Sequence, residues 1–290
     1  MTGLPGKWFP WAAATVLVVI AAAVWLGRGD SSLDRAREAG MIHVGYAVEA
    51  PYAFLSSHGE VTGESPEVAR VIAGRLGIGR IEWRQAEFGV LIDELLSGRV
   101  DVIAAGMFIT PERARRVAFS EPTFHVQPAL LVPRGNPRGI HSYSQALATK
   151  DVRVAVLSGA IEESLLKGLG ARESQLASVP DALTGRVAVE SGYAAGLALS
   201  SPTIHWMELC DELGRTEAAQ PFTAPEAYQT AGLGYGAFVF RKDDRALLAA
   251  WNRELKTFVG GPEHRALVSR FGFGEAELPG ATTTEDILGR

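Results

Sequence analysis

The chain has 290 residues and a formal net charge of −5, with 28 basic and 33 acidic residues interspersed along it. Because no basic stripe runs along the sequence, nucleic acid is excluded as a partner. The six histidines are scattered without metal-ligand spacing, and the single cysteine, Cys210, cannot form an intramolecular disulfide. We therefore expect no metal site and no cofactor, in a chain long enough for two lobes of ordinary domain size.

The amino terminus predicts export from the cytoplasm. Residues 8–27 carry no charge and are flanked by Lys7 and Arg28. Such an apolar stretch of about 20 residues behind a basic residue indicates an export signal and is also long enough to span a bilayer. Residues 1–32 are thus either a removed signal peptide or a membrane anchor. No second apolar run of that length follows, so we expect the rest of the chain on the periplasmic or extracellular face of the cytoplasmic membrane.

Helices and strands then alternate with short joints. Residues 34–39 are predicted to form a short helix that ends at Gly40, and residues 41–47 alternate apolar and polar side chains as a strand does. A hairpin with its tip at residues 58–60 precedes an amphipathic helix over residues 63–76. This order favours an α/β fold with mostly parallel sheets.

The pattern then repeats, with a strand over residues 81–87, a helix over residues 88–96 and an inner strand over residues 101–106. A proline interrupts the chain after the first strand of the lobe, which places Glu49 and Tyr52 on a loop at a strand's carboxyl end. That edge is where open α/β sheets usually bind ligands.

The stretch over residues 106–122, Gly-Met-Phe-Ile-Thr-Pro-Glu-Arg-Ala-Arg-Arg-Val-Ala-Phe-Ser-Glu-Pro, gives the first functional indication. Thr110 can cap a helix that begins at Pro111, because proline suits the first helical position. Arg113 then lies in the first turn, where its charge opposes the helix dipole. There it is poorly placed for helix stability and well placed to bind an anion beside free backbone amides.

Two details of this stretch bear on a site. Gly106 closes the inner strand, and its lack of a side chain lets another group approach the backbone closely. Arg113 also has a structural alternative, which is a surface ion pair with Glu82 or Glu87. The residues alone leave both interpretations of Arg113 open.

A second αβ unit follows an apolar extended run over residues 128–133. The loop over residues 134–139 is our predicted boundary between two lobes. Residues 152–157 form the next strand, and Ser-Gly-Ala leads from it into a helix over residues 161–169. A glycine at such a joint can present backbone amides to an anion.

The rest of the chain completes this unit and returns to the first lobe. The Gly-x-Gly-x-Gly run at residues 232–236 precedes a strand and not a helix, which argues against a phosphate loop and indicates a second crossing between lobes. Two crossings imply a cleft that can close by hinge motion. The predicted divisions are residues 33–133 and 234–280 for lobe 1, residues 134–233 for lobe 2, and residues 281–290 for a polar tail.

The motif over residues 106–122, with Thr-Pro-Glu-Arg and Phe-Ser-x-Pro, resembles the polar amino-acid family of extracellular solute-binding proteins that feed ABC importers. The resemblance runs from about residue 33 to about residue 279. Glu-Ala-Pro-Tyr at residues 49–52 and Phe-Gly-Phe-Gly at residues 271–274 are similar to the ectoine/hydroxyectoine-binding branch. The resemblance implies a type II periplasmic-binding-protein fold, a monomer without catalytic activity, and a membrane permease as partner.

The resemblance also implies a ligand site for a zwitterion. An arginine binds the ligand's carboxylate, three aromatic rings enclose its cation, and an acid is their partner. Ectoine carries a delocalised amidinium and a carboxylate, which such groups bind at about 2 kcal/mol per ring and about 1.5–3 kcal/mol for the arginine. For the rings the alternative is ordinary core packing. The predicted ligand-binding residues are Glu49, Tyr52, Phe88, Gly106, Phe108, Arg113, Ala160 and Ile161.

One departure narrows the ligand class. Relatives that bind ordinary amino acids usually place an acid near the end of the second lobe's inner strand, and residues 192–204 contain none. This argues against a primary α-amine and for a charge-delocalised cation. The alternatives that stay open are an amino-acid receptor of the same family, a dehydratase-like enzyme with Glu49 as acid or base, and a membrane-anchored sensory module.

Overall fold

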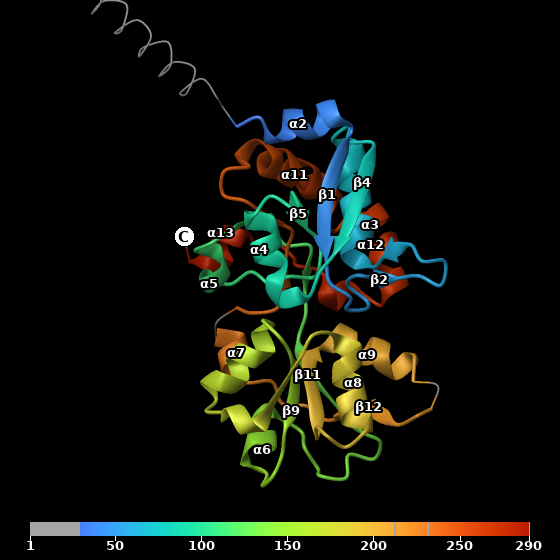
Figure 1. Ribbon diagram of the computed structural model, residues 1–290, viewed down its shortest axis with the longest axis vertical. Helices are drawn as coiled ribbons and strands as arrows, with labels where there is room; N and C mark the ends of the chain where they lie inside the picture. Colours follow the sequence, from blue (N-terminus) through green and yellow to red (C-terminus); the bar gives the residue numbers. More distant parts are fainter. Residues whose placement is uncertain (1–29, 212, 231, 290) are drawn as a thin grey trace, which may run out of the picture.

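The computed structural model describes residues 30–211, 213–230 and 232–289, which form two lobes, one above the other in Figure 1. The predicted export segment over residues 8–27 lies outside the described residues. Among the helices that are described, none is long and apolar enough to cross a membrane.

The first lobe is built on a five-stranded sheet of order β4-β1-β5-β14-β6. The central strand β1 runs parallel to β4 and β5, whereas β14 is antiparallel to β5 and β6. Met41 to Tyr46 form β1 because apolar side chains alternate into the core, where Ile42 and Val44 are fully buried. The strands are β1 (Met41–Tyr46), β4 (Arg80–Gln85), β5 (Val102–Ile103), β6 (Ala118–Phe119) and β14 (Val239–Phe240).

Helices from both the start and the end of the sequence pack on this sheet. The helix α2 ends at Gly40, whose left-handed backbone, with φ +62°, closes the last turn. The helix α11 buries Trp251 against Phe238 and Phe240, at ring-centroid distances of 5.2 and 5.7 Å. The elements are α2 (Ser32–Ala39), the hairpin β2 (Phe54–Leu55) and β3 (Val61–Thr62), α3 (Glu64–Arg75), the 3-10 turn η1 (Phe88–Val90), α4 (Leu91–Leu96), α5 (Pro111–Ala114), α11 (Arg245–Phe258), α12 (Pro262–Val268) and the 3-10 turns η3 (Ser269–Phe271) and η4 (Glu275–Glu277).

The second lobe has its own five-stranded sheet, of order β10-β9-β11-β8-β12. The strands β10, β9 and β11 are parallel, and β8 pairs antiparallel with β11 and β12. The elements are β8 (Pro128–Pro133), α6 (Tyr143–Ala148), β9 (Val154–Leu157), α7 (Ile161–Gly168), the 3-10 turn η2 (Glu173–Gln175), β10 (Leu176–Val179), α8 (Ala182–Glu190), β11 (Gly196–Ser200), α9 (Ser201–Leu209), β12 (Thr216–Ala218) and α10 (Glu226–Thr230).

Two segments cross between the lobes and pair with each other. The strand β7 (Phe124–His125) lies antiparallel to β13 (Tyr235–Gly236), and the rings of His125 and Tyr235 stack at 4.1 Å. The chain thus has the predicted α/β class, with two lobes and two crossings. The prediction of mostly parallel sheets is wrong, because each five-stranded sheet is mixed, with two parallel and two antiparallel pairings. Both crossings pass beside the site described below.

Two details of the predicted domain division need correction. The strand β8, which we assigned to the first lobe, pairs within the second sheet, so the predicted boundary at residues 134–139 comes one strand too late. The predicted tail contains a helix, α13 (Thr284–Leu288), that docks on the first lobe. The backbone N–H of Thr284 donates to Glu121 Oε2 at 2.9 Å, and its hydroxyl donates to the Ser120 carbonyl at 2.6 Å.

Candidate functional site

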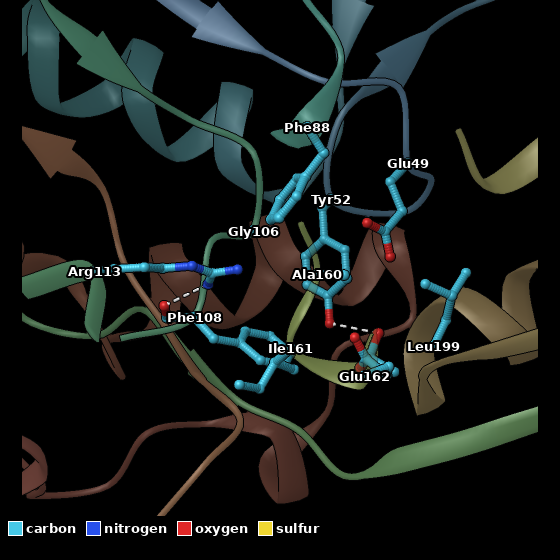
Figure 2. Close-up of a pocket in the computed structure, with 11 residues that line it drawn as sticks. Glu49, Tyr52, Phe88, Gly106, Phe108, Arg113, Ala160, Ile161, Glu162 and Leu199 are labelled. Atoms are coloured by element: carbon cyan, nitrogen blue, oxygen red, sulfur yellow. Dashed lines mark hydrogen bonds between the residues drawn. The ribbon is translucent and has the colours of Figure 1, made fainter. Parts of the chain in front are cut away.

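One pocket between the lobes brings together all eight residues predicted to bind a ligand (Figure 2). The first lobe contributes the loop after β1, the turn η1, the segment after β5 and the helix α5. The second lobe contributes the start of α7 and the end of β11. The binding role of these residues stays a prediction, but their convergence is a fact of the fold. The lining residues are Glu49, Tyr52, Phe88, Gly106, Phe108, Arg113, Ala160, Ile161, Glu162, Leu199 and Ser200.

Gly106 determines where the Tyr52 ring lies. Its backbone has φ +63°, and a Cβ atom placed there would lie 2.5 Å from Tyr52 Cγ. The group that approaches this glycine closely is therefore the Tyr52 ring. The Gly106 N–H is already used, because it donates to Ser65 Oγ at 3.2 Å.

The three predicted aromatic residues line the pocket and also pack into the core. Tyr52, Phe88 and Phe108 are 2%, 6% and 6% exposed. Phe124 supports two of them from behind, with its ring centroid 5.0 Å from that of Tyr52 and 6.1 Å from that of Phe108. The rings can therefore be both a cage for a ligand and part of the core, because each belongs to a core cluster and also lines the pocket.

Arg113 points into the cleft, as Figure 2 shows. Its Nη1 donates to the Phe108 carbonyl at 2.8 Å, and its Nη2 donates across the cleft to the Gly159 carbonyl at 2.9 Å. The predicted cap is present, because the Arg113 backbone N–H donates to Thr110 Oγ1 at 3.2 Å. Burial lowers the pKa of Arg113 to about 10, so the side chain stays cationic at neutral pH.

The alternative prediction for Arg113, a surface ion pair with Glu82 or Glu87, is wrong. Glu82, one of the two proposed partners, instead accepts a hydrogen bond from Arg84 at 2.7 Å. Within the described ranges, Arg113 forms no ion pair with Glu82 or Glu87. Its guanidinium carbon lies 5.5 Å from the centre of the Phe88 ring, which holds the cation against an aromatic face.

A buried chain of hydroxyl groups links the lobes at the other side of the pocket. Tyr52 donates to Ser200 Oγ at 2.9 Å, Ser200 Oγ lies 3.2 Å from Thr203 Oγ1, and Thr203 donates to Glu49 Oε1 at 2.8 Å. Tyr52 and Glu49 belong to the first lobe, whereas Ser200 and Thr203 belong to the second. Burial raises the pKa of Glu49 to about 7, with the Thr203 hydrogen bond opposing the shift.

These contacts hold the two lobes closed over a small cavity. The cavity volume is about 20 Å³, which accommodates about one water molecule. The backbones of the lobes also touch, since a Cβ on Gly159 would lie 2.8 Å from Gly89 Cα. A solute of several heavy atoms can therefore enter only when the lobes separate.

Sequence reasoning missed three lining residues, Glu162, Leu199 and Ser200. Ser200 ends β11, in a stretch whose only predictive feature was its lack of acids. Glu162 lies in the first turn of α7, where an acid is expected for the helix dipole alone. Its position directly after Ala160 and Ile161 was the one available signal for a site role.

Comparisons with known proteins agree with this two-lobed arrangement. The family model for bacterial extracellular solute-binding proteins, family 3, matches residues 42–275. A probable amino-acid ABC transporter periplasmic-binding protein of Sinorhizobium fredii, y4tE, is 31% identical over 262 residues, which cover 89% of this chain and 86% of that protein.

Solved structures give the same result. The crystal structure of EhuB in complex with hydroxyectoine superposes with a TM-score of 0.81 at 29% identity, covering 90% of this chain and 99% of that one. The ancestral amino acid-binding protein AncCDT-1, described as a precursor of cyclohexadienyl dehydratase, has a TM-score of 0.72 at 26% identity and covers 83% of this chain and 99% of its own.

Proposed function

The chain belongs to family 3 of the bacterial extracellular solute-binding proteins, as its motifs predicted, and we propose that it is the substrate-binding component of an ABC importer for a small zwitterionic solute. One observation carries this proposal. The pocket between the lobes combines the half-buried guanidinium of Arg113 with three aromatic rings and a carboxyl group, Glu49. Such a set matches a ligand with one anionic and one cationic group.

Arg113 is the proposed carboxylate-binding residue. A guanidinium has five N–H donors, and two nitrogen atoms here already hold it in place through the Phe108 and Gly159 carbonyls. The remaining N–H groups are available to a carboxylate inside the pocket. A charge-assisted contact of this kind contributes about 1.5–3 kcal/mol.

Tyr52, Phe88 and Phe108 are the proposed binding residues for the ligand's cation, with Glu49 as their acidic partner. Aromatic faces attract a desolvated cation by about 2 kcal/mol each. The likeness to EhuB, which was crystallised with hydroxyectoine, supports a ligand of the ectoine class. The alternative within the family is a polar amino acid, for which the relative in Sinorhizobium fredii, named an amino-acid transporter protein, is the argument.

Calorimetry with a ligand panel tests this proposal. We expect ectoine or hydroxyectoine to bind with micromolar affinity, which corresponds to about 8 kcal/mol, and glycine betaine and common amino acids to bind more weakly. Arg113→Ala should abolish binding, while Arg115→Ala, on the exposed side of the same segment, should leave it unchanged. Tight binding of glutamine or arginine without heat from ectoine would refute the ectoine class, and unchanged binding in Arg113→Ala would refute the carboxylate role.

An enzyme on this scaffold is the second candidate. Two buried carboxyl groups, those of Glu49 and Glu162, line one pocket and have raised pKa values, a feature of acid–base sites. The likeness to a precursor of a dehydratase points the same way. Nuclear magnetic resonance of a bound solute after long incubation separates the two functions, because a transport receptor returns the solute unchanged.

We also propose the periplasmic or extracellular face of the cytoplasmic membrane as the location, since the family is extracellular. The protein would act there as a monomer that delivers its solute to a membrane permease. Mass spectrometry of the protein from membrane and soluble fractions tests the location. An intact residue 8–27 segment in the membrane fraction indicates an anchor, and its loss indicates a cleaved signal.

A further inference from the structure

Glu162 is a buried carboxyl group that lacks the partners such a group normally has. It is 3% exposed, lies in the first turn of α7 and lines the pocket. Of the described residues, no other side chain hydrogen-bonds to it, and its own backbone N–H is its donor. Buried carboxylates are normally paired, because removing the charge from water is costly.

The neighbouring residue Glu163 shows what a structural acid looks like in the same turn. One of its carboxylate oxygens accepts from the Gly159 N–H at 3.0 Å and the other from Lys167 Nζ at 2.7 Å. Its side chain is 19% exposed and does not line the pocket. The two acids therefore differ in partners, although both lie near the positive end of the same helix.

The charges of the pocket are arranged in two groups. In the view of Figure 2, Arg113 lies at one end, and the carboxyl groups of Glu49 and Glu162 lie toward the other, beside the Tyr52 ring. Glu49 raises the pKa of Glu162 and Arg113 lowers it, while burial is the largest effect and brings the pKa to about 8. A ligand carboxylate at Arg113 thus leaves the ligand's cation facing two acids.

On the basis of the proposed function, we propose that Glu162 is a second ligand-binding carboxyl group and that the ligand's cation carries N–H donors on two sides, one for Glu49 and one for Glu162. The two acids come from opposite lobes, so a cation with two such donors also joins the lobes. Cyclic amidinium, guanidinium and ammonium groups meet this requirement. A fully methylated ammonium has no N–H, so it would give neither carboxyl group a donor from the ligand.

The test compares Glu162→Gln with the matched variant Glu163→Gln by calorimetry. The probes are ectoine, hydroxyectoine, L-arginine, L-glutamine and glycine betaine, of which glycine betaine lacks an N–H. We expect every probe with an N–H cation that binds the natural protein to lose at least tenfold in affinity in Glu162→Gln. In Glu163→Gln the loss should stay below threefold. Glycine betaine should bind at least tenfold more weakly than the best N–H probe.

A purely structural role of Glu162 gives different results. If the side chain only stabilises the start of α7, Glu162→Gln lowers the melting temperature of the protein without ligand and leaves affinity unchanged, which overturns the inference. Binding of glycine betaine as tight as that of ectoine overturns it as well. Glu162→Asp, which keeps a carboxyl group at the helix start but withdraws it by one methylene, should also lose at least tenfold in affinity and serves if the glutamine variant does not fold.

Failure of the proposed function has its own signature. If no probe binds the natural protein, the ligand class is wrong and this inference falls with it. If a probe binds the natural protein and Glu162→Gln equally, only the role of Glu162 is wrong.

Discussion

At the scale of single residues, the site depends on a glycine as much as on charged groups. Tyr52 is packed against Phe124 and Phe273 and reaches Ser200 with its hydroxyl group. The ring occupies this position because Gly106 has no Cβ. A residue without a side chain therefore controls both an aromatic wall of the pocket and a contact between the lobes.

Gly106→Ala should be more destabilising than an alanine substitution at a comparable glycine. Gly59, at the hairpin tip, has φ +78° but no atom within 4 Å of its Cβ position, so Gly59→Ala measures backbone strain alone. That strain costs about 1–2 kcal/mol. In Gly106→Ala the added methyl group overlaps Tyr52, which costs about 1–3 kcal/mol more. Urea unfolding of both variants checks this, and equal losses would contradict it.

The position of Arg113 could be predicted from the sequence because it depends on neighbouring residues alone. Thr110, Pro111 and Arg113 act within one helical turn, so capping rules place the arginine without tertiary information. Glu162 was not predicted, because the helix dipole alone explains an acid in a first helical turn. Only the packing of α7 against the first lobe shows that its side chain faces the pocket.

At the scale of elements, closure depends on two short segments, the turn η1 and the joint before α7. Gly89 and Gly159 lie against each other, and a Cβ on Gly89 would be 3.1 Å from the Ser158 carbonyl oxygen. Arg113 donates to the Gly159 carbonyl beside this contact. The two glycines thus set how closely the lobes can approach.

Gly89→Val should hold the lobes apart. A valine side chain at this position meets the backbone of the other lobe, so we expect ligand affinity to fall at least tenfold and Gly89→Ala to have a smaller effect. Stability to urea should change little, because the contact lies between lobes. Small-angle X-ray scattering with ligand should give a larger radius of gyration for Gly89→Val than for the natural protein.

Gly74→Val, on the exposed side of α3 with no atom near its Cβ position, is the control. Closure as tight as in the natural protein would contradict this role.

The order of elements could be predicted, whereas sheet membership could not. Alternating patterns and glycine stops placed most helices and strands within a few residues. The strand β8 was assigned to the wrong lobe because an apolar run with a proline at each end does not specify its neighbours. Its pairing with β11 and β12 depends on contacts far apart in the sequence.

At the scale of the whole molecule, buried carboxyl groups link closure to pH. One apolar cluster contains Phe88 of the first lobe and Ala160 of the second, so closing the lobes excludes water around the pocket. Glu49 and Glu162 are buried there, and Glu64 is fully buried within the first lobe. Glu64 Oε2 accepts a hydrogen bond from Ser65 Oγ at 2.6 Å, and Glu64 forms no ion pair with any described residue.

The protein without ligand should therefore lose stability as pH rises from about 6.5 to about 8. Burial raises the pKa of Glu49 and Glu64 to about 7 and that of Glu162 to about 8, from 4.5, so in this window the folded state binds more protons than the unfolded state. Each carboxyl group that is protonated only in the folded state lowers the free energy of unfolding by up to about 1.4 kcal/mol per pH unit of increase.

The lower limit of this window comes from histidine. Burial lowers the pKa of His264 from 6.5 to about 4. Below pH 6.5 the contribution of His264 to the free energy of unfolding therefore rises with pH, opposite to that of the carboxyl groups. Glu64→Gln should reduce the loss between pH 6.5 and 8 without changing ligand affinity, because Glu64 does not line the pocket. Urea unfolding at four pH values in this window measures the free energy of unfolding of both proteins. A natural protein whose stability stays constant or rises would show that these carboxyl groups are already ionised in the folded state, and parallel curves would exclude Glu64 as a source of the slope.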